Sequence, residues 1–159
     1  MTTKTPSPGD ALAPARLRAA VATDLQAIER LLTASALPLD GVRDALSTFV
    51  VAESEGELVG VAGLERCREN ALLRSVAVAD AWRSRGVGRA LVERVIADAE
   101  SRGVRALYLL TTTAERWFPS FGFEAIERGM APDDIRATAE FRGACPASAT
   151  MMRRDCARR

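Results

Sequence analysis

The segment 73–91 (LRSVAVADAWRSRGVGRAL) constrains the fold most, because an apolar strand pattern in it leads through a short loop into an amphipathic helix. Gly86 and Gly88 stand where that helix begins, and glycines let backbone N–H groups face a ligand without a side chain in the way. The N-terminus of a helix adds partial positive charge. Three arginines bring full charges to the same loop: Arg83, Arg85 and Arg89. The segment therefore predicts a seat for an anion such as a diphosphate.

Two familiar nucleotide-binding motifs do not match this loop. A P-loop requires a lysine after its second glycine, and the loop contains none. A dinucleotide fingerprint requires a third glycine, and Leu91 stands at that position. A purely structural alternative stays open, in which the glycines form a tight strand-to-helix turn and the arginines are solvated.

The composition is that of a globular chain, with 48% apolar and 27% charged residues in a length of 159. Basic and acidic residues nearly balance, 22 against 21, so the net charge of +1 favours neither a nucleic acid nor an anionic membrane as partner. The chain has no histidine, which excludes Ser–His–Asp and Cys–His nucleophile pairs. With only three cysteines besides, we expect no metal site.

The first residues, 1–14, are rich in Thr, Pro and Ala and lack an apolar signal core. We expect a flexible N-terminal tail on a cytoplasmic protein, followed by one domain over residues 15–156. No stretch of the chain has the roughly 18 to 20 apolar residues that span a bilayer, so we expect no membrane partner.

The order of the patterns predicts an α+β fold, a mixed sheet with helices on its faces. Thr23 and Gln26 form a capping-box pattern at the start of the first helix, and Gly103 marks the end of the glycine-loop helix. The predicted helices begin near residues 23, 40, 87, 114 and 132. The predicted strands are 15–21 at an edge, 48–53, 57–64, 71–78, 104–111, 123–127 as a last inner strand, and 149–153.

Residues 83–88 (RSRGVG) resemble the R/Q-x-x-G-x-G/A loop of the GNAT superfamily of N-acetyltransferases. Downstream, residues 114–123 (AERWFPSFGF) are similar to that superfamily's A-x-x-(F/L)-Y-x-x-x-G-F segment. With the first helix and the strands before the loop, the resemblance covers residues 16–127. It implies a GNAT-like, mostly antiparallel mixed sheet that splays between its fourth and fifth strands, with helices on both faces. It also implies acetyl-CoA as co-substrate.

The resemblance further implies which residues contact acetyl-CoA. The pantetheine arm would enter the splay like an added strand, and the pyrophosphate would bind the backbone amides of the glycine loop. The N–H near Val76 would stabilise the developing oxyanion. Thr111 stands where the superfamily often places an asparagine, so that contact passes to a hydroxyl or is lost. The implied cofactor residues are Val76, Ala77, Val78, Arg83, Ser84, Arg85, Gly86, Val87, Gly88, Arg89 and Thr111.

The catalytic acid of the superfamily is missing, because Phe118 replaces the tyrosine commonly credited with protonating the departing thiolate. The single tyrosine, Tyr108, lies in a predicted buried strand and is interpreted as core. A thiol with a pKa of about 8.5 can leave without an acid, and another group or water is the alternative. Glu65 is the first candidate for the general base and Glu115 the second, although each is also typical of a surface carboxylate.

Arg74 interrupts an otherwise apolar strand pattern, and burying an unpaired charge is costly. With Ser75, it is a candidate to bind an anionic group of the acceptor. The alternative is an ion pair with a protein carboxylate such as Glu65 or Glu69.

Segments 72–75 (LLRS), 135–141 (IRATAEF) and 145–149 (CPASA) are similar to acetyltransferases of arsenic-resistance operons. This narrower resemblance implies detoxification of a small amino acid bearing an arsinate or phosphinate, with Arg136 or Arg142 as helpers. Direct arsenite binding would need Cys67, Cys145 and Cys156 to converge, and packing is the simpler role for Cys145.

We therefore expect an N-acetyltransferase that acts on a small-molecule amine. The alternatives are a protein, peptide or antibiotic amine as acceptor, or a non-catalytic sensor of acetyl-CoA, which Phe118 favours. Members of the superfamily often pair, which leaves a homodimer open.

Overall fold

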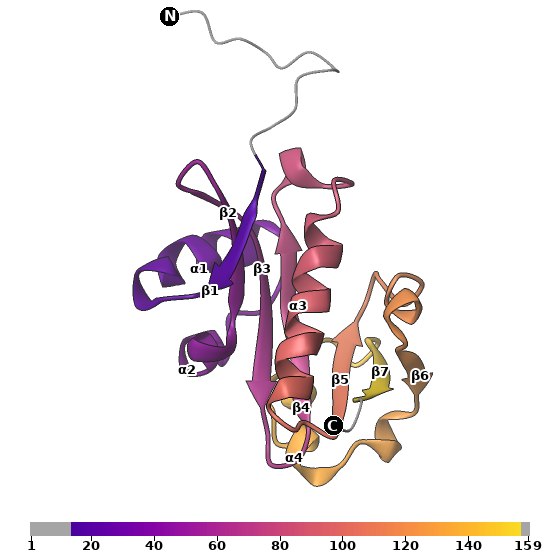
Figure 1. Ribbon diagram of the computed structural model, residues 1–159. Coiled ribbons are helices and arrows are strands. Elements are labelled where there is room, and N and C mark those ends of the chain that lie inside the picture. The colour runs from indigo at the N-terminus through magenta and orange to yellow at the C-terminus, as the bar shows by residue number, and fades with distance from the viewer. Residues whose placement is uncertain (1–13, 157–159) are drawn as a thin grey trace, which may run out of the picture.

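The computed structural model describes residues 14–156, so the tail expected over the first residues lies outside the described residues. One seven-stranded sheet runs through this part of the chain in the order β1-β2-β3-β4-β5-β7-β6 (Figure 1). Its strands are β1 (Arg16–Ala19), β2 (Val50–Ser54), β3 (Glu57–Arg66), β4 (Ala71–Val78), β5 (Ala106–Thr111), β6 (Glu124–Ile126) and β7 (Thr150–Asp155). The helices are α1 (Leu25–Ala34), α2 (Val42–Ala45), α3 (Val87–Ser101) and α4 (Asp133–Arg136).

The sheet opens between β4 and β5, as the resemblance implies. These two strands are parallel and pair only at Ala71 with Leu107 and Leu72 with Tyr108, whereas the other neighbouring strands are antiparallel. Beyond Leu72 the strands diverge (Figure 1). The backbone of the second half of β4 is therefore left without a strand neighbour on its β5 side.

A bulge in β4 accompanies the opening. Ser75 has φ +58, a left-handed value that is uncommon for a residue with a side chain. Arg74 pairs with Gly63 and Ala77 pairs with Val61, so β4 carries one more residue than β3 over this interval. An extra residue bends a strand and re-aims its side chains.

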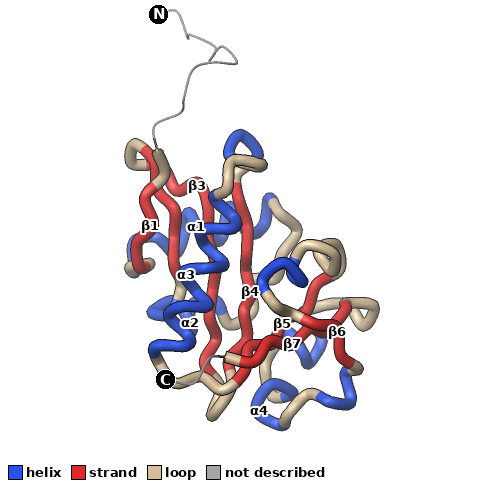
Figure 2. The backbone as a smooth tube through the Cα atoms, turned by 45° about the vertical axis from the view of Figure 1, so that its right-hand side comes forward, coloured by secondary structure: helices blue, strands red, loops and turns tan. Residues whose placement is uncertain are grey.

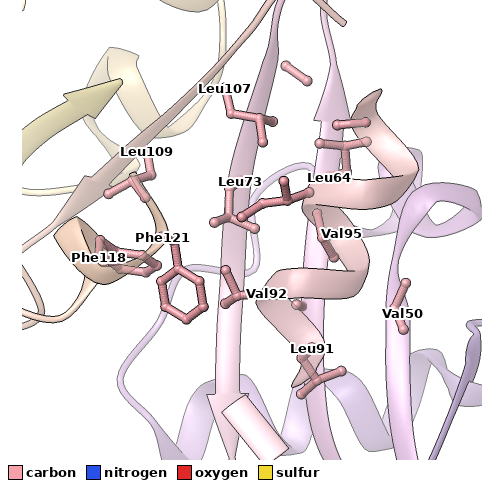
Figure 3. Close-up of a cluster of buried hydrophobic side chains, with 14 of the residues drawn as sticks. Val50, Leu64, Leu73, Leu91, Val92, Val95, Leu107, Leu109, Phe118 and Phe121 are labelled. Carbon is pink, nitrogen blue, oxygen red and sulfur yellow. The ribbon is translucent and has the colours of Figure 1, made fainter. Parts of the chain in front are cut away.

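Each face of the sheet is covered by its own helices. Helix α3 packs on one face, where its buried residues Leu91, Val92 and Val95 meet strand residues such as Leu73 (Figure 3). A Cβ placed at Gly60 of β3 would lie only 2.8 Å from Cδ1 of Leu91, so this glycine permits the close approach of helix and sheet. Helices α1 and α2 cover the other face through a separate cluster, which includes Ile28, Leu32, Val42 and Phe49.

The start of α1 differs from the predicted capping box of Thr23 and Gln26, both of which are exposed. Asp24 instead caps the 3-10 turn, Ala22–Asp24, that leads into α1, because its carboxylate accepts a hydrogen bond from the N–H of Val21 at 2.8 Å. The same carboxylate pairs with Arg18 of β1 at 2.7 Å. Asp24 therefore fixes the helix start to the edge strand as well as to the backbone.

The end of the chain inserts a strand into the sheet. We expected residues 123–127 to form the last inner strand, and this was wrong, because β7 pairs with β5 and leaves β6 at the edge. Figure 2 shows β5, β7 and β6 lying together beside β4. The helix expected over residues 114–121 is reduced to a 3-10 turn, Phe118–Phe121, with Pro119 in its first turn. Proline has no N–H to donate, and Gly122 at φ +88 ends the turn.

The segment between β6 and β7 folds back over the sheet. Ile135 of α4 and Met151 of β7 pack with Leu72 and Tyr108 in a third apolar cluster. A wide helical turn, Glu140–Ala144, follows α4 and brings Glu140 into the interior. Within residues 14–156, no helix combines the length and the apolar character needed to cross a membrane.

Candidate active site

The opening of the sheet continues into a cleft of about 700 Å³. The second half of β4 forms one wall, the glycine loop and the start of α3 form the floor, and the turn after β5 forms the opposite wall. Eight of the residues that the sequence assigns to the cofactor line it: Val76, Ala77, Val78, Arg83, Ser84, Gly86, Gly88 and Arg89. The remaining lining residues are Ser35, Leu37, Trp82, Thr113, Ala114 and Trp117.

The glycine loop has the geometry of an anion seat. Gly86 caps α3 in the left-handed conformation with φ +83, and Ser84 before it has φ +62. The N–H groups of the first helical turn have no acceptor within the helix, so they are free to meet an anion. Gly88 also lines the cleft, and a Cβ there would lie 3.5 Å from Val78 and 3.6 Å from Trp117. The absence of that Cβ leaves the helix start open to a ligand.

Two arginines border the seat. Arg83 is exposed, and its Nε lies 3.3 Å from Asp80 and 3.4 Å from the carbonyl oxygen of Val78. Arg89 lies over the ring of Phe121, 4.6 Å from its centroid, and its Nη2 donates to the hydroxyl of Ser120 at 3.2 Å. Both guanidinium groups therefore add positive charge beside the N-terminus of α3.

Three predicted cofactor residues do not line the cleft. Arg85 and Val87 face a separate cavity of about 400 Å³ on the other side of the loop. The Oγ1 of Thr111 accepts a hydrogen bond from the N–H of Ala114 at 3.0 Å, so its hydroxyl fixes the turn after β5.

Arg74 lies in the bulged part of β4, and its side chain is 0% exposed. Nη1 donates to the carboxylate of Glu65 at 2.9 Å, and Nε donates to the hydroxyl of Ser75 at 3.1 Å. A Cβ placed at Gly41 would lie 3.0 Å from Nη1, so the loop before α2 covers the guanidinium. The sequence left open a pair with Glu65 or Glu69, and the first of these forms, whereas Glu69 pairs with Arg105 at 3.0 Å.

One nitrogen of this guanidinium has no partner. Among the described residues, Nη2 of Arg74 and Nε of Arg128 are the buried side-chain polar atoms without a hydrogen bond. Leaving a buried donor unsatisfied costs about 1–3 kcal/mol, and more for a charged group. An oxygen atom of a ligand would remove that cost.

Glu140 is the third charged residue of the cluster formed by Arg74 and Glu65, and the sequence analysis did not identify it. Its Oε1 lies 3.5 Å from Nε of Arg74, and its side chain is 5% exposed. Burial raises the pKa of this carboxyl, Arg74 opposes the rise, and Glu65 adds to it. Glu140 comes 66 positions after Arg74 in the chain, and no local pattern connects the two.

The family-model comparison decides which kind of protein this is: residues 45–125 match the model described as "Acetyltransferase (GNAT) domain". The chain belongs to the GNAT acetyltransferase family. An uncharacterized N-acetyltransferase of Chlorobaculum tepidum is 29% identical over 98 residues, which are 61% of this chain and 63% of that protein. The amino-acid acetyltransferase of Pseudomonas fluorescens is 33% identical over 52% of this chain and 20% of its own length. The match thus spans less than two thirds of either relative.

Solved structures agree with this GNAT fold. An N-acetylglutamate synthase from Neisseria gonorrhoeae, complexed with CoA and N-acetyl-glutamate, has a TM-score of 0.78 at 23% identity, over 94% of this chain and 37% of that one. Rv2747 from Mycobacterium tuberculosis, in complex with CoA, has a TM-score of 0.77 at 23% identity, over 89% of this chain and 99% of that one.

The residue that the resemblance places at the catalytic-acid position, Phe118, belongs to the core. Phe118 is buried, and its ring centroid lies 5.0 Å from that of Trp117 and 5.8 Å from that of Phe123. Tyr108 is buried in β5, as predicted, and its hydroxyl accepts a hydrogen bond from Nε of Arg153 at 3.0 Å. Neither aromatic residue lines the cleft.

None of the other candidates lines the cleft, including Arg74, Ser75 and Glu65. Glu65 lines a separate cavity together with Gly41 and Thr138.

Glu115 is exposed on the turn after β5, and Arg142 is exposed on the turn that contains Glu140. Arg136 donates to the carbonyl oxygens of Ala131 and Gly129, at 2.9 and 2.7 Å.

Burial raises the pKa of the Cys67 thiol to about 12 and that of Cys145 to about 11. Thiols that stay protonated are poor metal ligands.

Proposed function

We propose that residues 15–156 form an N-acetyltransferase domain that moves the acetyl group of acetyl-CoA to the amine of a small anionic acceptor. The observation that carries this proposal is the cleft, which joins the opened edge of β4 to the N-terminus of α3. One end of the cleft suits a diphosphate and the other offers free strand backbone. These are the two features that the pyrophosphate and the amide-containing arm of CoA require.

For the cofactor, we propose that the backbone of Val76 and Val78 binds the pantetheine arm. The amides from Arg83 to Arg89 would then bind the pyrophosphate, with the side chains of Arg83 and Arg89 as charged partners. Charge-assisted hydrogen bonds of this kind contribute about 1.5–3 kcal/mol each. The hydroxyl of Thr111 supports this site by holding the turn that places Thr113 and Ala114 in the cleft wall.

For the reaction, bound acetyl-CoA would supply an activated thioester. The N–H of Val76 is proposed to hold the carbonyl oxygen as it becomes negative. Glu65, 20% exposed at the end of β3, is proposed to accept the proton that the acceptor's ammonium must lose before attack. Because Phe118 cannot donate a proton, the thiolate would take its proton from water.

For the acceptor, we propose that Nη2 of Arg74 and the hydroxyl of Ser75 bind its anionic group. Both residues directly precede Val76 in β4, and both are buried behind the cleft wall that Val76 lines. Because Nη1 is engaged by Glu65, the contact from Arg74 would be a single hydrogen bond and not a bidentate one. The amino-acid acetyltransferases among the relatives support an amino acid as acceptor. Within that class, we propose an amino acid with an arsinate or phosphinate side chain, linked to arsenic resistance.

A second candidate function is a sensor that binds acetyl-CoA without transferring the acetyl group. Phe118 in the acid position favours it, since this ring is built into the core beside the cleft.

The test is the release of CoA thiol from acetyl-CoA with an acceptor panel. The panel contains L-glutamate, its methylphosphinate and methylarsinate analogues, a polyamine and a lysine peptide. Turnover on the anionic amino acids is expected, and turnover confined to the peptide or polyamine would overturn the acceptor class. Saturable cofactor binding without turnover on any acceptor would support the sensor.

A further inference from the structure

The cluster around Arg74 contains more carboxylate than cation. One guanidinium contacts Glu65 at 2.9 Å and Glu140 at 3.5 Å. Asp40, in the loop before α2, lies near enough to raise the pKa of Glu140 further. Two ionised carboxylates beside one arginine leave an uncompensated negative charge, which is costly for whichever carboxylate water cannot reach.

The two carboxylates are not equivalent. Glu65 makes the shorter contact and keeps 20% of its side chain exposed, so water can solvate its charge. Glu140 is 5% exposed and faces Nε, the nitrogen that already donates to Ser75 at 3.1 Å. A hydrogen bond from Cys145 lowers the pKa of Glu140 and so opposes the effect of burial, but burial is the larger influence. Arg128 lies near enough to Cys145 to lower the pKa of that thiol. Glu140 is therefore the weaker partner of Arg74 and the one whose neutral form is favoured.

We propose that Glu140 determines acceptor specificity by taking up a proton as the acceptor's negative group binds Nη2 of Arg74. This inference rests on the proposed function. Nη2 is buried and lacks a partner, so an acceptor oxygen there would add another negative charge to the cluster. When like charges share one site, the most buried group is the one that becomes neutral. The proton comes from solvent, and the Glu140 carboxylate becomes a carboxylic acid.

The substrate class follows from this exchange. The carboxylate, phosphinate or arsinate of an amino acid replaces the negative charge that Glu140 loses on protonation, so the net charge of the cluster stays the same. An amine with a neutral side chain offers no such replacement. Acceptor binding should thus weaken with rising pH, by up to about tenfold for each pH unit above the pKa of Glu140 in the acceptor-free enzyme.

The first test measures the carboxyl group itself. A ¹³C NMR titration of the acceptor-free protein, with the Glu140 signal assigned from its loss in Glu140→Gln, should give a midpoint above the usual range of glutamate. A midpoint within or below that range would overturn the inference, because Glu140 would then stay ionised at low cost. This readout does not depend on activity.

The second test measures the proton. Titration calorimetry of L-glutamate and its methylphosphinate analogue into the CoA-loaded protein is run in buffers of different ionisation enthalpy. Wild type should take up as much as one proton per acceptor bound, and Glu140→Gln none. Glu69→Gln, which alters an exposed carboxylate paired with Arg105, should behave as wild type. Binding without proton uptake in wild type overturns the role of Glu140 but leaves the proposed acceptor class intact. Absence of binding by both probes overturns the proposed acceptor class and the inference with it.

Discussion

Arg74 of β4 and Glu65 of β3 form an ion pair of 2.9 Å across two neighbouring strands, directly beneath the loop that contains Gly41. The pair ties the central strands to the segment before α2, and Glu140 extends the tie to the segment after α4. Three parts of the chain that are distant in sequence thus meet at one guanidinium, next to the opening of the sheet.

Replacing Arg74 should destabilise the fold strongly. Arg74→Met removes the cation and leaves two carboxylates beside each other, and breaking a buried ion pair in this way costs about 3–5 kcal/mol. Urea denaturation measures the change. Arg105→Met removes the cation of the exposed pair with Glu69 and should cost less than about 1 kcal/mol. Equal losses in the two variants would contradict the role given to Arg74.

Gly86 should matter for cofactor binding as well as for folding. Gly86 and Gly103 stand at opposite ends of α3 with similar φ values, +83 and +77, and neither would bring a Cβ within 4 Å of another atom. An alanine at either position should cost about 1–2 kcal/mol of stability, because the left-handed conformation disfavours a Cβ. Only Gly86→Ala should also weaken CoA binding, by about tenfold or more if one charge-assisted hydrogen bond is lost. Titration calorimetry measures the CoA affinity of both variants. Equal affinities would show that the glycine loop does not bind CoA.

The arginines of the loop should differ in their effect on CoA affinity. The side chain of Arg83 lines the cleft, whereas that of Arg85 faces the neighbouring cavity, although the two are separated by one residue. Arg83→Gln should weaken CoA binding about tenfold at low salt and less at high salt, since exposed charges are screened. Arg85→Gln should have little effect. A larger loss for Arg85→Gln would place the phosphates on the other side of the loop.

Glu140 should make stability depend on pH. Its pKa is raised in the folded state, so the folded protein binds more protons than the unfolded chain between the usual and the raised pKa. Stability should therefore fall as pH rises through that window. Glu140→Gln should match wild type below the usual glutamate pKa and exceed it above the raised value, by about 1.4 kcal/mol for each pH unit that separates the two pKa values. Thermal unfolding from about pH 4 to pH 9 checks this, and parallel curves for the two proteins would contradict it.

Much of the fold could be predicted because it is encoded locally. The apolar run that forms β4 (Ala71–Val78) and the stripe on α3 each predict an element from neighbouring residues alone. The place of β7 between β5 and β6 could not be predicted in this way. It depends on pairing between residues far apart in the chain, such as Tyr108 and Arg153, which are 45 positions apart, and no local periodicity reveals such pairing.

In the candidate site too, the residues of one continuous segment could be predicted and those from distant segments could not. The glycine loop and the open backbone of β4 lie in one continuous segment, and most of the residues predicted there line one cleft, whereas Arg85 and Val87 face another cavity. Ser35 and Leu37 reach that cleft from the loop after α1, and Glu140 reaches Arg74 from the turn after α4. Only tertiary packing brings them there. The isolated charge of Arg74 in an apolar strand was the one local signal, and it indicated either a protein carboxylate or an anionic group of the acceptor as its partner.

The proposed transfer of an acetyl group from CoA to an anionic amino acid can be tested directly. The most direct measurement incubates the purified protein with ¹³C-acetyl-CoA and L-glutamate or its methylphosphinate and methylarsinate analogues, and follows the label by mass spectrometry and NMR. We expect the label on the α-nitrogen of at least one of these acceptors, with release of an equal amount of CoA thiol. Cofactor that binds but keeps its label with every acceptor would contradict the proposal.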